Sequence, residues 1–88
     1  MPDIVVPKKF RRVARGKPQH LRAAIERCIG LLVDNPRHPG LNVHRVQGTS
    51  NVWEAYVDKA NRLTFHYDDE GRIVLRNNCN HDIVRRSP

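Results

Sequence analysis

Residues 18–36 have the sequence PQHLRAAIERCIGLLVDNP, and this stretch decides the fold class. Its apolar side chains recur at the spacing of one helix face: Leu21, Ile25, Cys28, Ile29 and Leu32. This spacing predicts an amphipathic helix that buries one continuous stripe. We expect the helix to open at Pro18 and to stop at Asn35-Pro36, because the residue before a proline disfavours helical backbone.

A shorter helix is predicted immediately before this one. Phe10, Val13 and Ala14 follow the same helical spacing, and Pro7 and Gly16 bound the segment. The two helices lie close enough along the chain to form a hairpin. Residues 3–6 precede them and have the β-branched composition of a short strand.

Beyond Pro36 the pattern changes to that of β-strands. Four strand-length segments, 41–47, 52–57, 62–67 and 73–77, are separated by turn-forming residues. Short loops between sequential strands predict an antiparallel meander. Side chains alternate between two faces in the third segment. The face that the helices would cover carries Leu63, Phe65 and Tyr67, and the open face carries Arg62, Thr64 and His66. The sequence therefore predicts one two-layer α+β domain over residues 1–88, with a short N-terminal strand and a helix hairpin packed on a four-stranded antiparallel meander.

Charge is distributed unevenly along the 88 residues, whose formal net charge is +7. The whole excess lies in residues 1–45, which hold ten basic and three acidic side chains. The densest cluster falls in the first predicted helix: Lys8, Lys9, Arg11, Arg12 and Arg15. Such a cluster indicates binding to RNA, DNA or an acidic protein, and the alternative is a solvated face without a partner.

Several protein classes are excluded by what the sequence lacks. Its apolar runs are too short to span a membrane, and its first residues lack a secretory signal, so we expect a cytoplasmic protein. Phosphate-binding glycine loops, paired zinc cysteines and zinc-protease motifs are also missing, so no metal and no cofactor are expected. Cys28 lies on the apolar helix stripe and is interpreted as a small buried hydrophobe.

Histidines are frequent, and His44, His66 and His81 lie on or just after predicted strands. Arginines accompany them along the same segments: Arg45, Arg62 and Arg76. RNA cleavage needs a base for the ribose 2′-OH, cations for the phosphorus transition state and an acid for the leaving oxygen. These residues can supply all three functions, and the alternative is that the histidines are hydrogen-bonded surface groups.

Six short segments occur in an informative order: PKKFRRVAR at 7–15, NPRHPGL at 35–41, HRVQG at 44–48, VWEAYV at 52–57, NRLTF at 61–65 and HDIV at 81–84. In this order they resemble the RelE/ParE superfamily of small basic bacterial toxins over nearly the whole chain. The resemblance implies a RelE-like fold and a type II toxin-antitoxin module, in which a cognate antitoxin holds the toxin inactive. Many relatives cleave mRNA on the ribosome, whereas the ParE branch inhibits DNA gyrase.

Candidate catalytic residues follow from this resemblance. His44 and His81 match the two histidines of the YafQ-like branch, which implies that they form the acid/base pair. Arg62 matches an arginine that is common in the family, and we expect it to bind phosphate together with Arg45. Arg76 would assist them.

Further residues complete the expected site. Asp82 or Glu54 would orient a histidine. Tyr56 stands where many relatives have an arginine, and it would supply a phenol or a base-stacking ring. Arg85 stands where relatives often have a C-terminal aromatic residue.

The leading hypothesis is a metal-independent endoribonuclease toxin (an mRNA interferase) that inhibits translation. Its basic helices would bind ribosomal RNA, and its partners would be mRNA, the ribosome and an antitoxin. Two alternatives remain open at this point. One is a ParE-like DNA gyrase inhibitor, and the other is a toxin-like fold that has lost nuclease activity and only binds its antitoxin.

Overall fold

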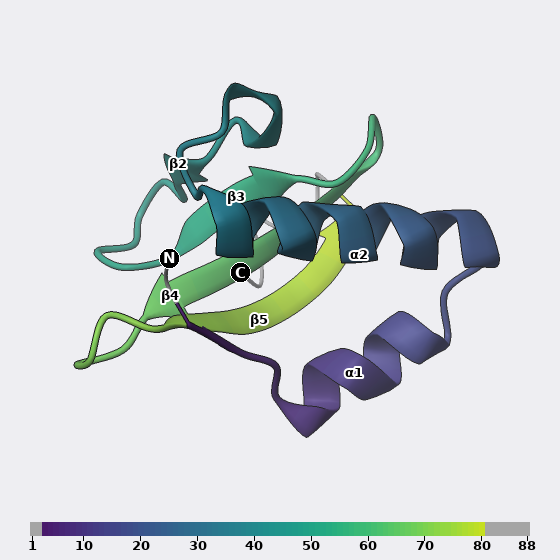
Figure 1. Ribbon diagram of the computed structural model, residues 1–88, viewed down its shortest axis with the longest axis horizontal. Helices are drawn as coiled ribbons and strands as arrows, with labels where there is room; N and C mark the ends of the chain where they lie inside the picture. The colour runs from purple at the N-terminus through teal and green to yellow at the C-terminus, as the bar shows by residue number, and fades with distance from the viewer. Residues whose placement is uncertain (1–2, 81–88) are drawn as a thin grey trace.

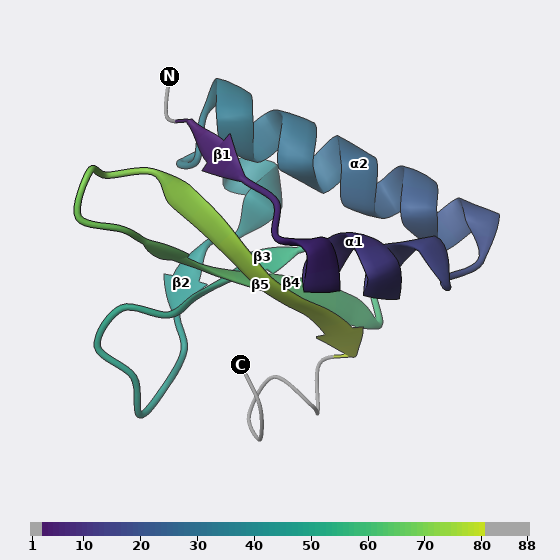
Figure 2. The same ribbon diagram turned by 90° about the horizontal axis from the view of Figure 1, so that it is seen from below.

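The computed structural model describes residues 3–80, which form two layers, a pair of helices and a mixed β-sheet (Figure 1). The helices are α1 (Lys8–Arg15) and α2 (Gln19–Asp34). The strands are β1 (Ile4–Val5), β2 (His44–Arg45), β3 (Trp53–Tyr56), β4 (Asn61–Tyr67) and β5 (Ile73–Asn80). Figure 2 shows that both helices cover the same face of the sheet. The predicted α+β class and two-layer arrangement are confirmed.

Both helices begin directly after a proline. The carbonyl of Pro7 accepts the N–H of Arg11 at 3.1 Å, and the carbonyl of Pro18 accepts the N–H of Arg22 at 3.0 Å. Proline suits this place because its missing N–H would have no helical partner. Helix α2 ends at Asp34, and the next residue, Asn35, has the extended backbone expected before a proline.

The sheet has one strand more than the predicted meander. Its order is β1-β5-β4-β3-β2, and neighbours from β5 to β2 run antiparallel. Strand β1 joins the far side of β5 in parallel, with Ile4 opposite Ile73 and Val5 opposite Val74. The predicted count of four strands in the sheet was therefore wrong by one. Pairing between segments so far apart in the chain leaves no local pattern to recognise.

Strand β2 is much shorter than the predicted segment 41–47. Residues Pro39–Leu41 form a 3-10 turn, and Asn42 follows in the left-handed conformation, with φ 47° and ψ 46°. Asparagine adopts this conformation more readily than most residues. Because of this turn, residues 41 and 42 are not available for strand pairing. The turn also places Leu41 in the core, where it is fully buried.

Strand β5 contains a bulge that changes which side chains face the helices. Thr64 pairs with Asn77, whereas Phe65 pairs with Leu75, so Arg76 is the extra residue. Beyond the bulge, Asn78 lies opposite Leu63 and therefore on the same face of the sheet. The Asn78 side chain is buried there, and its amide has no hydrogen-bond partner among residues 3–80.

The core lies between the helices and the sheet. The helices contribute Phe10, Leu21, Ile25, Cys28 and Leu32. The sheet contributes the alternate residues of its three long strands: Ala55, Leu63, Phe65, Ile73 and Leu75. The predicted helix-covered face of β4 is confirmed. Over the described part of the chain, neither helix has the length and apolar character needed to cross a bilayer.

Candidate active site

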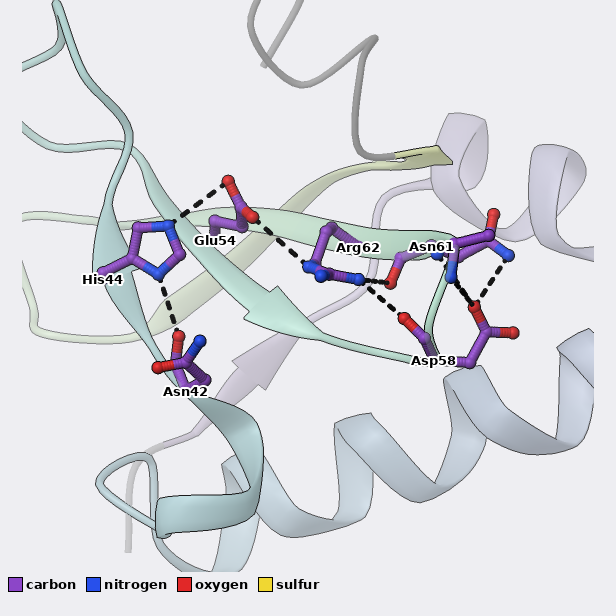
Figure 3. A network of polar contacts seen from close by, with 7 residues as sticks. Asn42, His44, Glu54, Asp58, Asn61 and Arg62 are labelled. Carbon is purple, nitrogen blue, oxygen red and sulfur yellow. Dashed lines mark hydrogen bonds and ion pairs between the residues drawn. The ribbon is translucent and has the colours of Figure 1, made fainter.

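Polar side chains gather on the sheet face opposite the helices, where β2, β3 and β4 meet (Figure 3). The strand register brings them together, because His44 lies opposite Glu54, and Tyr56 lies opposite Arg62. Directly opposed residues in antiparallel strands have Cβ atoms about 5 Å apart. Three sequence-predicted site residues, His44, Tyr56 and Arg62, therefore share one surface with Glu54.

The imidazole of His44 lies between two hydrogen-bond acceptors. Its Nδ1 is 2.9 Å from the carbonyl oxygen of Asn42, and its Nε2 is 3.5 Å from Oε2 of Glu54. A carbonyl can only accept, so Nδ1 carries a proton. Only the doubly protonated ring can donate to both neighbours. The His44 side chain is 52% exposed, which leaves it accessible to a substrate.

The guanidinium of Arg62 is held from several sides. Its Nη1 donates to the carbonyls of Asp58 at 2.6 Å and Asn61 at 2.9 Å, and its Nε is 3.4 Å from Oε1 of Glu54. The group also lies over the ring of Tyr56, 4.8 Å from the ring centroid, at a distance that permits a cation–π interaction. These contacts fix the position of the guanidinium. They are made by Nη1, Nε and the face of the group, and they do not involve Nη2.

Glu54 connects the two cationic groups. Its side chain is only 7% exposed, and a carboxylate so deeply buried is costly unless charged or hydrogen-bonding partners compensate. His44 and Arg62 supply that compensation from either side. When His44 is protonated, the three side chains carry two positive charges and one negative charge. The cluster is then net positive, which suits a phosphate.

The turn between β3 and β4 supports Arg62 through its backbone. Oδ1 of Asp58 accepts the backbone N–H groups of Ala60 at 3.0 Å and Asn61 at 2.8 Å, and the side-chain amide of Asn61 at 2.9 Å. Burial raises the pKa of Asp58, but these hydrogen bonds outweigh it and hold the pKa below its ordinary value. The ionised carboxylate thus fixes the turn whose carbonyls grip Arg62.

Comparison with solved structures identifies the fold. The chain superposes on the RelB-RelE antitoxin-toxin complex of Methanococcus jannaschii with a TM-score of 0.72 and 14% identity, covering 93% of this chain and 95% of that one. The toxin-antitoxin complex RelBE2 of Mycobacterium tuberculosis gives a TM-score of 0.72 and 19% identity, covering 92% and 100%. The chain has a RelE-like fold.

A third match is YafQ of E. coli, with a TM-score of 0.69 and 16% identity, covering 96% of this chain and 98% of that chain. No protein-family model and no curated protein matches the sequence. The likeness therefore lies in the backbone rather than in the residues. Because all three identities are low, the roles of individual side chains in this RelE-like fold have to be argued from its own geometry.

Of the other predicted arginines, Arg45 lies apart from the cluster. Arg45 pairs with Trp53, so it alternates to the opposite side of β2 from His44. Arg76 lies at the bulge, where its Nη1 is 3.2 Å from Nδ1 of His66. The RelE-like fold thus brings Arg62 to His44 but directs Arg45 away from it.

The basic residues of α1 are all exposed: Lys8, Lys9, Arg11, Arg12 and Arg15. His81, Asp82 and Arg85 lie outside the described residues. The thiol of Cys28 lies in the core, and burial raises its pKa to about 12, so this cysteine is not a nucleophile at neutral pH.

Two contributors were not singled out from the sequence. Asn42 and Asp58 act on the cluster through their backbone carbonyls. Every residue has a carbonyl, so the sequence carries no direct signal for this role. Indirect signals were present, because Asn42 favours a left-handed turn and Asp58 begins a turn-forming segment. Glu54 was considered only as one of two carboxylates that could orient a histidine, and it lies within 4 Å of His44.

Proposed function

We propose that this protein is the toxin of a type II toxin-antitoxin module and that it cleaves mRNA on the ribosome. The observation that carries the proposal is the cluster of His44, Glu54 and Arg62 on the sheet face opposite the helices of a RelE-like fold. A histidine beside a fixed arginine and a net positive charge are what phosphodiester cleavage requires. The fold alone allows several activities, so the cluster is the more specific support.

The chemistry can be divided among these side chains. His44 and His81 would act as the acid/base pair, one removing the proton of the ribose 2′-OH and the other protonating the departing 5′-oxygen. Arg62 would donate from Nη2 to the phosphate and stabilise the charge that develops on it. Glu54 would orient His44, and the ring of Tyr56 would stack on a neighbouring base.

Binding to the ribosome would use the other face of the molecule. The exposed basic side chains of α1 supply a dense positive charge that attracts ribosomal RNA. Because such contacts release counterions from the nucleic acid, we expect affinity for ribosomes to fall steeply with added salt.

An antitoxin would bind in the groove between α1 and α2. This groove has a volume of about 260 Å³ and an apolar floor that includes Phe10, Ile25 and Ile29. Its rim is mostly basic, with Arg11, Arg15 and Arg22 against one acidic residue, Glu26. An amphipathic segment with apolar side chains on one side and Asp/Glu on the other would complement both parts.

Cleavage of a translated mRNA by the purified protein, with and without ribosomes, tests the nuclease proposal. His44→Ala should reduce the cleavage rate by about a hundredfold or more, as expected for an acid/base group. His20→Ala is the matched control, because His20 is an exposed histidine of α2 outside the cluster. If neither His44→Ala nor His81→Ala slows cleavage, the assignment of the pair is wrong.

Expression in a bacterium distinguishes the nuclease hypothesis from its two alternatives. Loss of protein synthesis with new mRNA ends indicates the nuclease, whereas DNA breaks and an SOS response indicate a gyrase inhibitor. Unaffected growth under strong expression without an antitoxin indicates a fold that only binds its partner. The last two outcomes contradict the proposal.

A further inference from the structure

A second hollow lies on the helix side of the sheet, away from the His44–Glu54–Arg62 cluster. It is a cavity of about 480 Å³ beneath the loop that joins α2 to β2. Its lining includes Trp53 of β3, Tyr67 of β4 and His38 and Arg37 of the loop. Cavities that bind small molecules typically measure about 300–1,000 Å³, so this one is large enough for such a ligand.

Two aromatic rings form its inner wall. Trp53 and Tyr67 meet edge to face, with centroids 6.3 Å apart and ring planes 74° apart. Asn51 holds both residues: its Oδ1 accepts the indole N–H of Trp53 at 3.3 Å, and its Nδ2 donates to the carbonyl of Tyr67 at 2.8 Å. Both rings are only half-buried. The aromatic wall is therefore fixed in advance and still accessible.

The outer wall offers hydrogen-bond donors and positive charge. Nδ1 of His38 accepts the backbone N–H of Gly40 at 3.0 Å, so the neutral ring carries its proton on Nε2 and can donate. Arg37 is exposed and lines the cavity. Among residues 3–80, no aspartate or glutamate lines the cavity. A ligand with an anionic group is favoured here.

Gly40 allows the histidine to take this position. A Cβ at residue 40 would lie 3.1 Å from Nδ1 and 3.2 Å from Cε1 of His38. Any side chain there would press on the imidazole and disturb its orientation. The close approach of backbone to ring indicates that the donor wall is as well defined as the aromatic wall.

We propose that this cavity binds one nucleotide, with its base against Trp53 and Tyr67 and its phosphate at Arg37 and His38. Unpaired bases bind proteins by stacking on aromatic rings, and phosphates bind arginine through charge-assisted hydrogen bonds. The site does not depend on the proposed nuclease activity. Asn42 connects the two sites, because it lines the cavity and its carbonyl oxygen lies 2.9 Å from Nδ1 of His44.

Trp53 is the single tryptophan of the sequence, so its fluorescence reports on this cavity directly. We would titrate the full protein with AMP, adenosine, inorganic phosphate and a six-residue oligodeoxyadenylate, which lacks the 2′-OH needed for cleavage. AMP should quench the Trp53 fluorescence in a saturable way. Its apparent affinity should exceed that of adenosine alone or phosphate alone by about tenfold. Calorimetry should show matching heat.

Paired variants test the two walls separately. Arg37→Ala and His38→Ala should reduce the ratio of AMP affinity to adenosine affinity. The controls Arg27→Ala and His20→Ala, at exposed positions of α2, should leave this ratio unchanged. Tyr67→Leu should weaken AMP and adenosine alike. Saturable quenching by the oligonucleotide alone would support a site for one unit of a strand rather than a free nucleotide. The absence of quenching and heat with every probe, or equal AMP binding by Arg37→Ala and His38→Ala, would overturn the proposal.

Discussion

The two faces of the sheet bury side chains to a similar depth by different means. On the helix face, Leu63 and Phe65 are fully buried among apolar groups. On the opposite face, Thr64 is equally buried and Glu54 is nearly as buried, yet the residues opposite them on the adjacent strands are polar or charged. An open face was expected at Thr64, and at that position the expectation was wrong.

The difference separates fold from function. Apolar packing on the helix face is non-directional and supplies most of the stability. The polar face depends on defined distances, such as the 3.4 Å between Arg62 and Glu54. Buried charged pairs add little to the net stability of a folded protein. The loss of one partner nevertheless lowers that stability strongly, because the other charge stays buried without compensation. Variants on the two faces should therefore differ in both size and kind of effect.

The largest effect should come from the helix face. Phe65→Ala removes the largest fully buried side chain and leaves a cavity between the helices and β4. We expect the free energy of unfolding to fall by about 3–5 kcal/mol. Urea denaturation followed by circular dichroism measures it. A loss below about 1 kcal/mol would mean that this face is not the main source of stability.

Glu54→Gln should produce the largest effect on the opposite face. It removes the negative charge between His44 and Arg62. We expect a loss of about 3 kcal/mol, the low end of the range for a buried ion pair that loses one partner, because the Arg62 side chain is still 15% exposed. Glu70→Gln is the control, because Glu70 forms a comparable contact with Arg72 on the surface, where such pairs contribute about 0–1 kcal/mol. Equal losses for the two variants in urea denaturation would remove the distinction between them.

Asn78→Leu should sharpen the comparison by acting in the opposite direction. Its amide is a polar group on the apolar face, without a partner in the described part of the chain. Replacing it by a hydrocarbon of similar size should raise the free energy of unfolding by about 1 kcal/mol. Thermal unfolding by calorimetry measures this gain, and Asn78→Asp, which buries a charge, should lower the melting temperature instead. A loss of stability in Asn78→Leu would show that the amide has a bound partner, such as a buried water.

The smallest effect concerns pH and the turn that holds Arg62. Because the folded-state pKa of Asp58 lies below its ordinary value of about 4, its ionised form stabilises the native state above that value. This contribution is lost as the pH falls through the folded-state pKa. We expect wild type to lose more stability than Asp58→Asn between about pH 5 and pH 2, by less than about 1 kcal/mol. Parallel curves for the two proteins in acid would contradict this.

How much the sequence predicts depends on the range of the interaction. The stripe on α2 and the alternation in β4 are local patterns, and both are confirmed. The short β2 could not be predicted as easily, because Leu41 and Val43 fit a strand pattern that the turn at Asn42 overrides. The bulge at Arg76 is also invisible locally, and it alone places Asn78 on the helix face.

The candidate site shows the same division. His44 and Arg62 were singled out as chemical groups, and the strand register that joins them through Glu54 emerged only from the fold. Arg45 was predicted to bind phosphate together with Arg62, but alternation along β2 directs it to the other side of the strand from His44. Residues that contribute a carbonyl, such as Asn42, cannot be ranked from their side chains.

The position of β5 within the sheet has a consequence for synthesis. In the described chain β5 is the last strand to be made, yet it lies between β1 and β4 and supplies a partner to each. Until it leaves the ribosome, β1 has no neighbour and β4 has an unpaired edge. Contacts that span most of the chain also close slowly. We therefore expect co-translational folding to be delayed, so that the protein acquires its native surface only after β5 has emerged, and a protease added to stalled nascent chains should cleave those that lack β5 far faster than those that contain it.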